Sequence, residues 1–196
     1  MVEITEGRLK FTFGGGWDAV KYNESRWHTG QMKSQLKAMD ILATKDDRHW
    51  WIEIKDCEGY EEENRPRLSP AEPDEVGKTR IWIKDQGWAQ LIKADRKKPF
   101  IVDEVVAKFR DTLVALACAQ RRAEPELVKH EIVAVGQSLT VVLILTWDSR
   151  EFKRLAQRLQ DKLRNALIPY AVDAYVVNEP IPAAVGLRCT IERMNI

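Results

Sequence analysis

The sequence predicts an α/β fold in which a central mixed β-sheet is flanked by helices. Two segments, 103–120 and 149–167, have the apolar spacing of long amphipathic helices, and short apolar segments typical of strands precede and separate them. The last third of the chain then repeats a strand–helix–strand order. We expect all 196 residues to form one domain, because 44% of them are hydrophobic and a chain of this length can enclose a single core.

Four strands and one short helix are expected in the first half of the chain. The strands are expected at 3–13, 37–43, 49–55 and 79–84, and the helix at 17–28. Glycines 14–16 separate the first strand from the helix, and the polar run Lys45-Asp46-Asp47-Arg48 joins the next two strands as a tight turn. Because Trp82 falls within the expected strand at 79–84, we expect it in the core together with Trp50 and Trp147.

The second half is expected to contain the two long helices and four strands. Asp103 is a suitable N-cap for the helix at 103–120, and Asp148 or Ser149 for the helix at 149–167. The strands are expected at 132–135, 139–147, 174–178 and 187–191.

A long loop is expected at about 57–78, where acidic residues are followed by three prolines and few side chains are apolar. Loops of this length are commonly functional or disordered, and this one leaves the strand at 49–55. We therefore expect it to border the functional site described next. Its acidity favours a gate or a partner surface over a clamp for phosphate.

Two acids and a lysine form the candidate catalytic group. If the hairpin is centred on Asp46 and Asp47, Asp40 lies directly opposite Glu53 on the neighbouring strand. Alternation along the strand then places Lys55 on the same face as Glu53. Opposed carboxylates repel each other unless a cation lies between them, and Mg²⁺ (or Mn²⁺) needs only one or two protein carboxylates together with water and phosphate.

The pattern of Asp40 followed by Glu53-Ile54-Lys55 resembles the PD-(D/E)XK, or restriction-endonuclease-like, nuclease superfamily, in element order over about residues 17–120. The resemblance implies a restriction-endonuclease-like core and a Mg²⁺-dependent endonuclease or exonuclease. It assigns Asp40 and Glu53 to the metal and Lys55 to the attacking water and the transition state. The backbone carbonyl of Ile54 is a further candidate ligand. The proline of the family name is absent, since Met39 precedes Asp40.

Further residues are candidates for the metal or for the substrate. Glu24 falls on the inner face of the expected helix at 17–28, where relatives in this superfamily often place another acidic ligand. Basic residues that we consider for contact with nucleic acid are Lys97, Lys98, Lys108, Arg110, Arg154 and Arg158. For Glu24 the alternative is a side chain that turns outward or pairs with Arg26 or Lys21, and for the basic residues it is a solvated surface charge.

Composition restricts the remaining function classes. A net charge of +1 means that contact with nucleic acid must come from local basic patches. Three widely spaced cysteines predict neither a disulfide framework nor a zinc site, and they favour a reducing cytoplasm. The acidic first residues and the short apolar runs lead us to expect no targeting segment and no membrane span.

Several functions remain open from the sequence. The first is a nuclease in a restriction, repair or anti-phage defence system, as a homodimer or beside a partner subunit. The second is a nuclease-like module that binds nucleic acid or protein without cleaving it. The third is a small-molecule metallohydrolase, or an assembly protein whose acidic residues Glu61 to Glu63 dock a partner.

Overall fold

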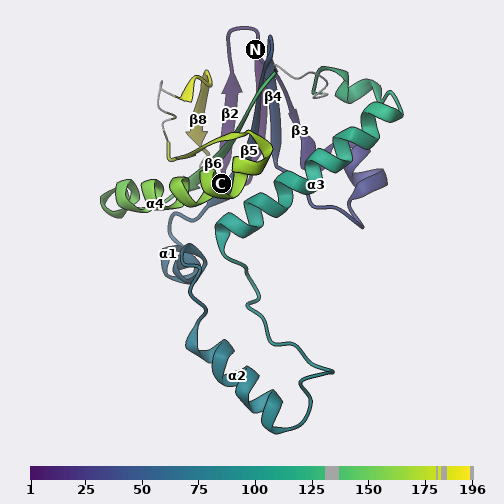
Figure 1. Cartoon of the computed structure of the whole chain (residues 1–196). Helices are drawn as coiled ribbons and strands as arrows, with labels where there is room; N and C mark the ends of the chain where they lie inside the picture. The colour runs from purple at the N-terminus through teal and green to yellow at the C-terminus, as the bar shows by residue number, and fades with distance from the viewer. Residues whose placement is uncertain (131–136, 180, 182–184, 195–196) are drawn as a thin grey trace.

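Two β-sheets and the helices beside them make up the body of the computed structural model, which describes residues 1–130, 137–179, 181 and 185–194 (Figure 1). A five-stranded sheet has the order β3-β4-β5-β6-β7, and a three-stranded sheet has the order β1-β2-β8. The strands are β1 (Val2–Glu6), β2 (Leu9–Phe13), β3 (Asp18–Lys21), β4 (Ile41–Lys45), β5 (Arg48–Asp56), β6 (Ser138–Thr146), β7 (Asp173–Val177) and β8 (Cys189–Arg193). The expectation of an α/β fold with a mixed sheet flanked by helices is confirmed.

The five-stranded sheet is mixed because its two halves are connected differently. β3, β4 and β5 are antiparallel neighbours, whereas β5, β6 and β7 run parallel. Parallel neighbours need a crossover, which α3 (Ile101–Arg121) and α4 (Ser149–Leu167) provide. The carboxyl ends of β5 and β6 therefore meet at one edge of the sheet.

The central strands of this sheet are covered on both faces. On one face, Trp51, Leu143 and Leu145 pack in a core with apolar residues of α3 and α4. On the other face, Trp50 and Ile52 belong to a second core, which includes the apolar residues of the three-stranded sheet. The molecule is thus layered as helices, sheet and sheet, and residues of β5 are enclosed from both sides.

A partly buried polar cluster at the end of β5 ties the two sheets together. The Asp56 carboxylate accepts hydrogen bonds from Arg8 at 2.7 Å, from Thr146 at 2.7 Å and from Arg193 at 3.2 Å. Burial acts to raise the pKa of Asp56, but these hydrogen bonds and the arginine charges outweigh it and leave that pKa lowered. The charge of Asp56 is therefore neutralised between the sheets.

The first expected strand and the first expected helix are both wrong. Residues 3–13 form a hairpin, β1 and β2, because Gly7 adopts a φ of 56° that allows the chain to turn back. Residues 18–21 form the edge strand β3 and pair with β4, and short turns of helix follow at Tyr22–Glu24 and His28–Met32. The expected helix at 17–28 had only three apolar residues on its inner face. Hydrogen bonding of residues 18–21 to the edge of the sheet is therefore preferred over that helix.

The expected strand at 79–84 is also wrong, since those residues belong to α2 (Asp74–Asp85). Acids in its first turn and Lys84 in its last turn suit the helix dipole. Figure 1 shows α2 extending away from the body at the end of a long excursion. Trp82 lies on this arm and is 54% exposed, whereas Trp50 and Trp147 are buried as expected.

Two further expectations need correction: the strand expected at 37–43 begins only at Ile41, as β4, and the segment expected as a loop at about 57–78 contains α1 (Glu61–Asn64), η3 (Arg65–Leu68) and the first turn of α2. The other elements agree closely with expectation. α3, α4, β6 and β7 lie within two residues of their expected ends, and the Asp148 carboxylate caps α4 by accepting a hydrogen bond from the Arg150 amide at 2.8 Å. β8 forms, but in the smaller sheet. The expected strand at 132–135 lies outside the described residues. In the described part of the chain, every helix is too short or too polar to cross a bilayer.

Candidate functional site

The β4–β5 hairpin has the register that places Asp40 opposite Glu53. Ile41 pairs with Ile52 and Lys45 with Arg48, so Asp46 and Asp47 form a two-residue turn in which Asp46 has a φ of 54°. The Asp40 amide donates to the Ile52 carbonyl at 3.0 Å and continues the pairing by one residue. The register expected from the sequence is confirmed.

Lys108 of α3 joins the two acids. Its Nζ donates to Glu53 Oε1 at 2.6 Å and to Asp40 Oδ1 at 3.3 Å. Glu53 is fully buried and the Asp40 side chain is only 8% exposed. An ammonium group therefore stands where a cation shared by both carboxylates would be expected.

Lys55 extends the cluster on the same face of β5. Its Nζ lies 2.7 Å from Glu53 Oε1 and 2.8 Å from Glu104 Oε1 of α3. Arg67 forms an ion pair with the other oxygen of Glu104. Because Arg67 belongs to the short helix η3 (Arg65–Leu68), the acidic and proline-rich segment at 57–78 does reach the cluster.

Backbone and amide donors orient Asp40. The Ile54 amide donates to Asp40 Oδ2 at 2.8 Å, and the Asn23 side-chain amide donates to Oδ1 at 3.1 Å. Since the N–H and C=O of one strand residue face the same neighbouring strand, the Ile54 carbonyl is directed toward the Asp40 side as well. The Ile54 carbonyl therefore remains a candidate for the third oxygen ligand.

One face of α3 provides the other wall of the site. Glu104 and Lys108 contact the side chains of β5 and Asp40, as described above. One turn further, Asp111 accepts a hydrogen bond from the Lys37 amide at 2.9 Å, and Thr112 accepts one from the Met39 amide at 2.9 Å. These positions repeat at helical spacing, so α3 fixes the segment leading to Asp40 and the catalytic candidates together.

Burial dominates the electrostatics of Glu53. Loss of solvent raises the pKa of its carboxyl to about 7, the negative charge of Asp40 adds to that rise, and Lys55 and Lys108 oppose it. Both lysines contact Oε1, whereas Oε2 is buried and has no hydrogen-bond partner. A buried carboxylate oxygen without a partner is costly, and a cation ligand is one role that accounts for it.

Lys55 and Glu104 are held in their charged forms. Burial acts to lower the pKa of Lys55, but the charges of Glu53 and Glu104 outweigh it and the pKa is raised. Burial acts to raise the pKa of Glu104, but Lys55 and Arg67 outweigh it and the pKa is lowered. Lys55 is therefore a fixed positive charge at neutral pH.

The oxygen atoms of Asp40, Glu53 and Ile54 fit a metal site with few protein ligands. Two opposed carboxylates and a nearby carbonyl satisfy the needs of Mg²⁺, which retains several waters and accepts phosphate oxygens. No group of three or more histidine, cysteine, aspartate or glutamate side chains able to hold a metal occurs among the described residues. Any metal here must therefore take part of its coordination from water or substrate, and Lys108 must yield its place.

Glu24 does not join this cluster. It lies in the short helix Tyr22–Glu24, its side chain is 65% exposed, and it pairs with Lys21 at 2.7 Å. The reason is that the expected helix at 17–28 does not form, so Glu24 does not face the sheet. Asn23, its neighbour, reaches Asp40 instead.

The basic residues considered for nucleic acid lie in four different places. Lys108 is part of the buried cluster rather than a surface contact. Lys97 and Lys98 are exposed at the end of the arm, and Arg110 is exposed on α3. Arg154 and Arg158 are exposed on α4 and line one groove.

Sequence reasoning missed Asn23, Arg67 and Glu104. Glu104 lies four residues before Lys108 on the clearest expected helix, so a polar pair within a helix that covers a sheet was an available signal. Arg67 and Asn23 follow no periodic pattern, and only the tertiary structure brings them to the acids.

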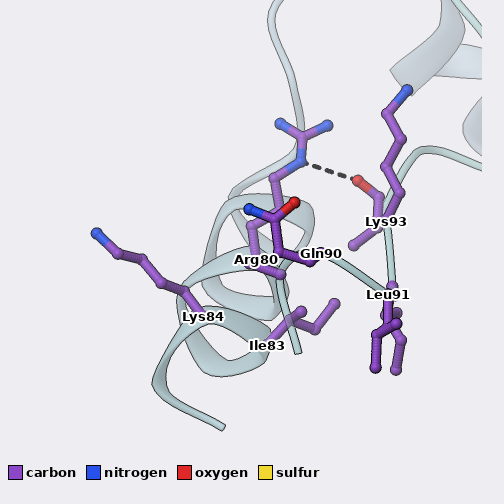
Figure 2. Close-up of a pocket in the computed structure, with 9 residues that line it drawn as sticks. Arg80, Ile83, Lys84, Gln90, Leu91 and Lys93 are labelled. Carbon is purple, nitrogen blue, oxygen red and sulfur yellow. Dashed lines mark hydrogen bonds between the residues drawn. The ribbon is translucent and has the colours of Figure 1, made fainter. Parts of the chain in front are cut away.

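A separate pocket of about 450 Å³ lies in the arm, between α2 and the segment that follows it. Figure 2 shows Arg80 and Ile83 of α2 beside the segment that carries Leu91 and Lys93, whereas the Lys84 side chain extends away from that segment; Arg80 donates to the Ala94 carbonyl at 2.8 Å. No acidic residue lines this pocket. It is apolar and basic, and it contains none of the catalytic candidates.

Comparison of the chain with protein families, with curated proteins and with solved structures gives no match to any of them.

Proposed function

We propose that this protein is a metal-dependent nuclease that hydrolyses phosphodiester bonds at the Asp40–Glu53–Lys55 cluster. The observation that carries the proposal is the position of two buried, opposed carboxylates beside two ammonium groups, with one carboxylate oxygen left without a partner. Phosphodiester hydrolysis needs both a divalent cation and positive charge near the phosphate.

Asp40 and Glu53 would hold Mg²⁺, with the Ile54 carbonyl as a further oxygen ligand. When bound, the metal supplies Lewis acidity toward a phosphate oxygen and activates water. The amide of Ile54 and the side chain of Asn23 orient Asp40 for this role. The role of Glu53 requires its ionised form, which a bound cation favours.

Lys55 would stabilise negative charge that develops on the phosphate. A lysine whose pKa is raised stays protonated at neutral pH, which suits charge stabilisation better than removal of a proton from water. Glu104 positions the ammonium, and Arg67 in turn positions Glu104.

The test is cleavage of labelled DNA and RNA with Mg²⁺ or Mn²⁺. We expect cleavage by the unaltered chain, and at least a hundredfold loss in Asp40→Asn and Lys55→Met. Arg121→Met, at the exposed end of α3, is the matched control and should cleave normally. Cleavage that survives both Asp40→Asn and Lys55→Met would refute the assignment.

A non-catalytic, nucleic-acid-binding module is the second candidate. The specific observation in its favour is that the Lys108 ammonium contacts both carboxylates, in the place that a shared metal ion would take. This candidate is supported if the chain binds nucleic acid but cleaves neither DNA nor RNA with either metal. We propose a reducing cytoplasm for either activity, since Cys57, Cys118 and Cys189 are all free thiols.

A further inference from the structure

A groove of about 710 Å³ opens between η3 and the first half of α4. Its apolar floor includes Trp147 and Leu155, which are largely buried. Its walls carry four arginines, which we call the arginine track: Arg65, Arg150, Arg154 and Arg158. Glu151 is the one acid among the residues that line it.

Most of the positive charge of the arginine track is not neutralised within the chain. Glu151 pairs with Arg65 at 3.3 Å. Arg158 donates to the Leu68 carbonyl at 3.2 Å but meets no carboxylate, and Arg150 and Arg154 form no ion pair in the described part of the chain. Three guanidinium groups thus share one groove and have no ion-pair partner among the described residues, an arrangement that favours the binding of a polyanion.

The spacing of the arginine track matches an extended ligand rather than a single anion. Arg150, Arg154 and Arg158 follow one another at four-residue intervals, so they lie on one face of α4 at steps of about 6 Å. A second groove of about 510 Å³ shares Arg154 and Arg158 and adds Lys153, with Asp161 as the one acid in its lining. The basic surface therefore continues along the helix.

The groove also lies next to the proposed active site. Thr146, the residue before Trp147, is the register partner of Asp56, the residue after Lys55. Strand spacing and rise place the Cα atoms of Trp147 and Lys55 roughly 8 Å apart. The helix η3 connects both places, since its Arg65 lines the groove while its Arg67 pairs with Glu104.

We infer that the arginine track binds the phosphodiester backbone of nucleic acid and leads it toward Lys55. The destination of the strand rests on the proposed function, whereas the binding itself does not need cleavage. Guanidinium groups recognise phosphate oxygens through paired hydrogen bonds, and such contacts hold a backbone in position without reading its sequence.

The test is fluorescence anisotropy of a labelled oligonucleotide in EDTA, where no cleavage occurs. We expect the double variant Arg150→Ala/Arg154→Ala to weaken binding at least tenfold. With a single-stranded oligonucleotide, the slope of log affinity against log salt concentration should be smaller in magnitude by about 1.4 for this variant, because two phosphate contacts are lost. Alanine is a good helix former, so α4 should persist, and circular dichroism checks this.

The matched control removes two other exposed arginines, in Arg26→Ala/Arg121→Ala, and should change affinity less than twofold. The affinities for the single-stranded and duplex forms of one sequence show which form of nucleic acid the groove prefers. Equal losses in both double variants, no binding by the unaltered chain, or equally tight binding of poly-glutamate would overturn the inference.

Failure of the two proposals can be told apart. Asp40→Asn should bind the oligonucleotide in EDTA as tightly as the unaltered chain does. Binding that depends on the arginine track without any cleavage would support the inference while removing the proposed nuclease activity. Cleavage that is unaffected by Arg150→Ala/Arg154→Ala would overturn the inference and leave the nuclease proposal intact.

Discussion

At the scale of single residues, Lys108 has the most consequential position. It offsets the repulsion between Asp40 and Glu53, and both acids are almost fully enclosed. Removal of one partner from a buried ion cluster leaves charge uncompensated and typically costs about 3–5 kcal/mol. The same ammonium group must leave its place if a metal is to bind there. Lys108 therefore stabilises the folded protein and competes with a metal ion for the two carboxylates.

The Lys108→Met variant tests both roles. In EDTA, we expect its free energy of unfolding to fall by about 3 kcal/mol or more, because the two opposed carboxylates lose the one ammonium group that contacts both, and only Glu53 keeps a lysine partner, Lys55. Mn²⁺ or Mg²⁺ should restore much of that loss by binding between them. Thermal unfolding with and without metal measures the effect, with Arg110→Met as the control. Undiminished stability in EDTA, together with no response to metal, would contradict both roles.

His130 makes folding sensitive to acid. Burial lowers its pKa to about 4; nearby His49 and Lys129 add to this, and Asp18, at 3.6 Å from its Nε2, opposes it. Above pH 6.5 the imidazole is neutral in both the folded and the unfolded chain. Between pH 6.5 and 4 only the unfolded chain binds the proton, so stability falls as the pH falls and then levels off below pH 4.

The His130→Gln variant should lose this part of the pH dependence. In the unaltered chain, titration of His130 should lower the free energy of unfolding by at most about 3 kcal/mol between pH 7.5 and 4. Urea unfolding at several pH values measures the slope for both proteins, and the comparison subtracts the titration of the carboxylates. An identical slope in the variant would show that His130 does not titrate in this way.

At the scale of elements, α3 determines where the catalytic candidates stand. Thr112 is fully buried and its hydroxyl accepts a hydrogen bond from the Met39 amide, directly before Asp40. Thr112→Val keeps the shape but leaves that amide without a partner, so we expect a loss of about 1–3 kcal/mol. Val114→Thr, on the exposed side of the same helix, should change stability by less than about 0.5 kcal/mol. Urea unfolding measures both, and equal effects would contradict the role of Thr112.

The sequence predicted those elements whose apolar period is long and whose ends are marked. α3 and α4 each span about five turns, and the β4–β5 hairpin has a polar turn of two residues between apolar strands. The expectations failed at 17–28 and 79–84, where only a few apolar residues could be matched to a period. In both segments the tertiary structure determines the secondary structure. Residues 18–21 pair with β4 at the edge of the sheet, and residues 79–84 belong to the projecting helix α2.

The candidate site was predictable only in part. Asp40, Glu53 and Lys55 follow from hairpin register and strand alternation, which are local rules. Lys108 and Glu104 form a polar pair that can be recognised on the expected helix, but the sequence does not show which strand residues they contact. Arg67 follows no periodic pattern, and only the tertiary structure brings it to Glu104. Glu24 was misplaced because its role depended on a helix that does not form.

At the scale of the whole molecule, the arm at α2 stands apart from the two cores. Trp82 is 54% exposed and packs edge-to-face on Trp88 at 5.6 Å, whereas Trp51 is 1% exposed in the helix-covered core. We expect Trp51→Ala to cost about 3–5 kcal/mol and Trp82→Ala less than about 1 kcal/mol. Chemical denaturation compares the two, and equal losses would show that the arm is part of the cooperative core.

The layers of the molecule also place the proposed chemistry. The three-stranded sheet closes one face of β5, and α3 and α4 close the other, so the acids are reached from the edge where Lys55 and Lys108 are 15% and 18% exposed. The groove lined by the arginine track opens near the carboxyl ends of β5 and β6, close to Lys55. Open α/β sheets bind ligands at this edge.

The most direct test of the metal site is an anomalous difference map from crystals of the full chain soaked in Mn²⁺. The account predicts a peak between Asp40 and Glu53, at about 2.0–2.2 Å from one oxygen of each, with the Lys108 ammonium displaced. A map with no peak there, and with Lys108 still in contact with both carboxylates, would contradict it.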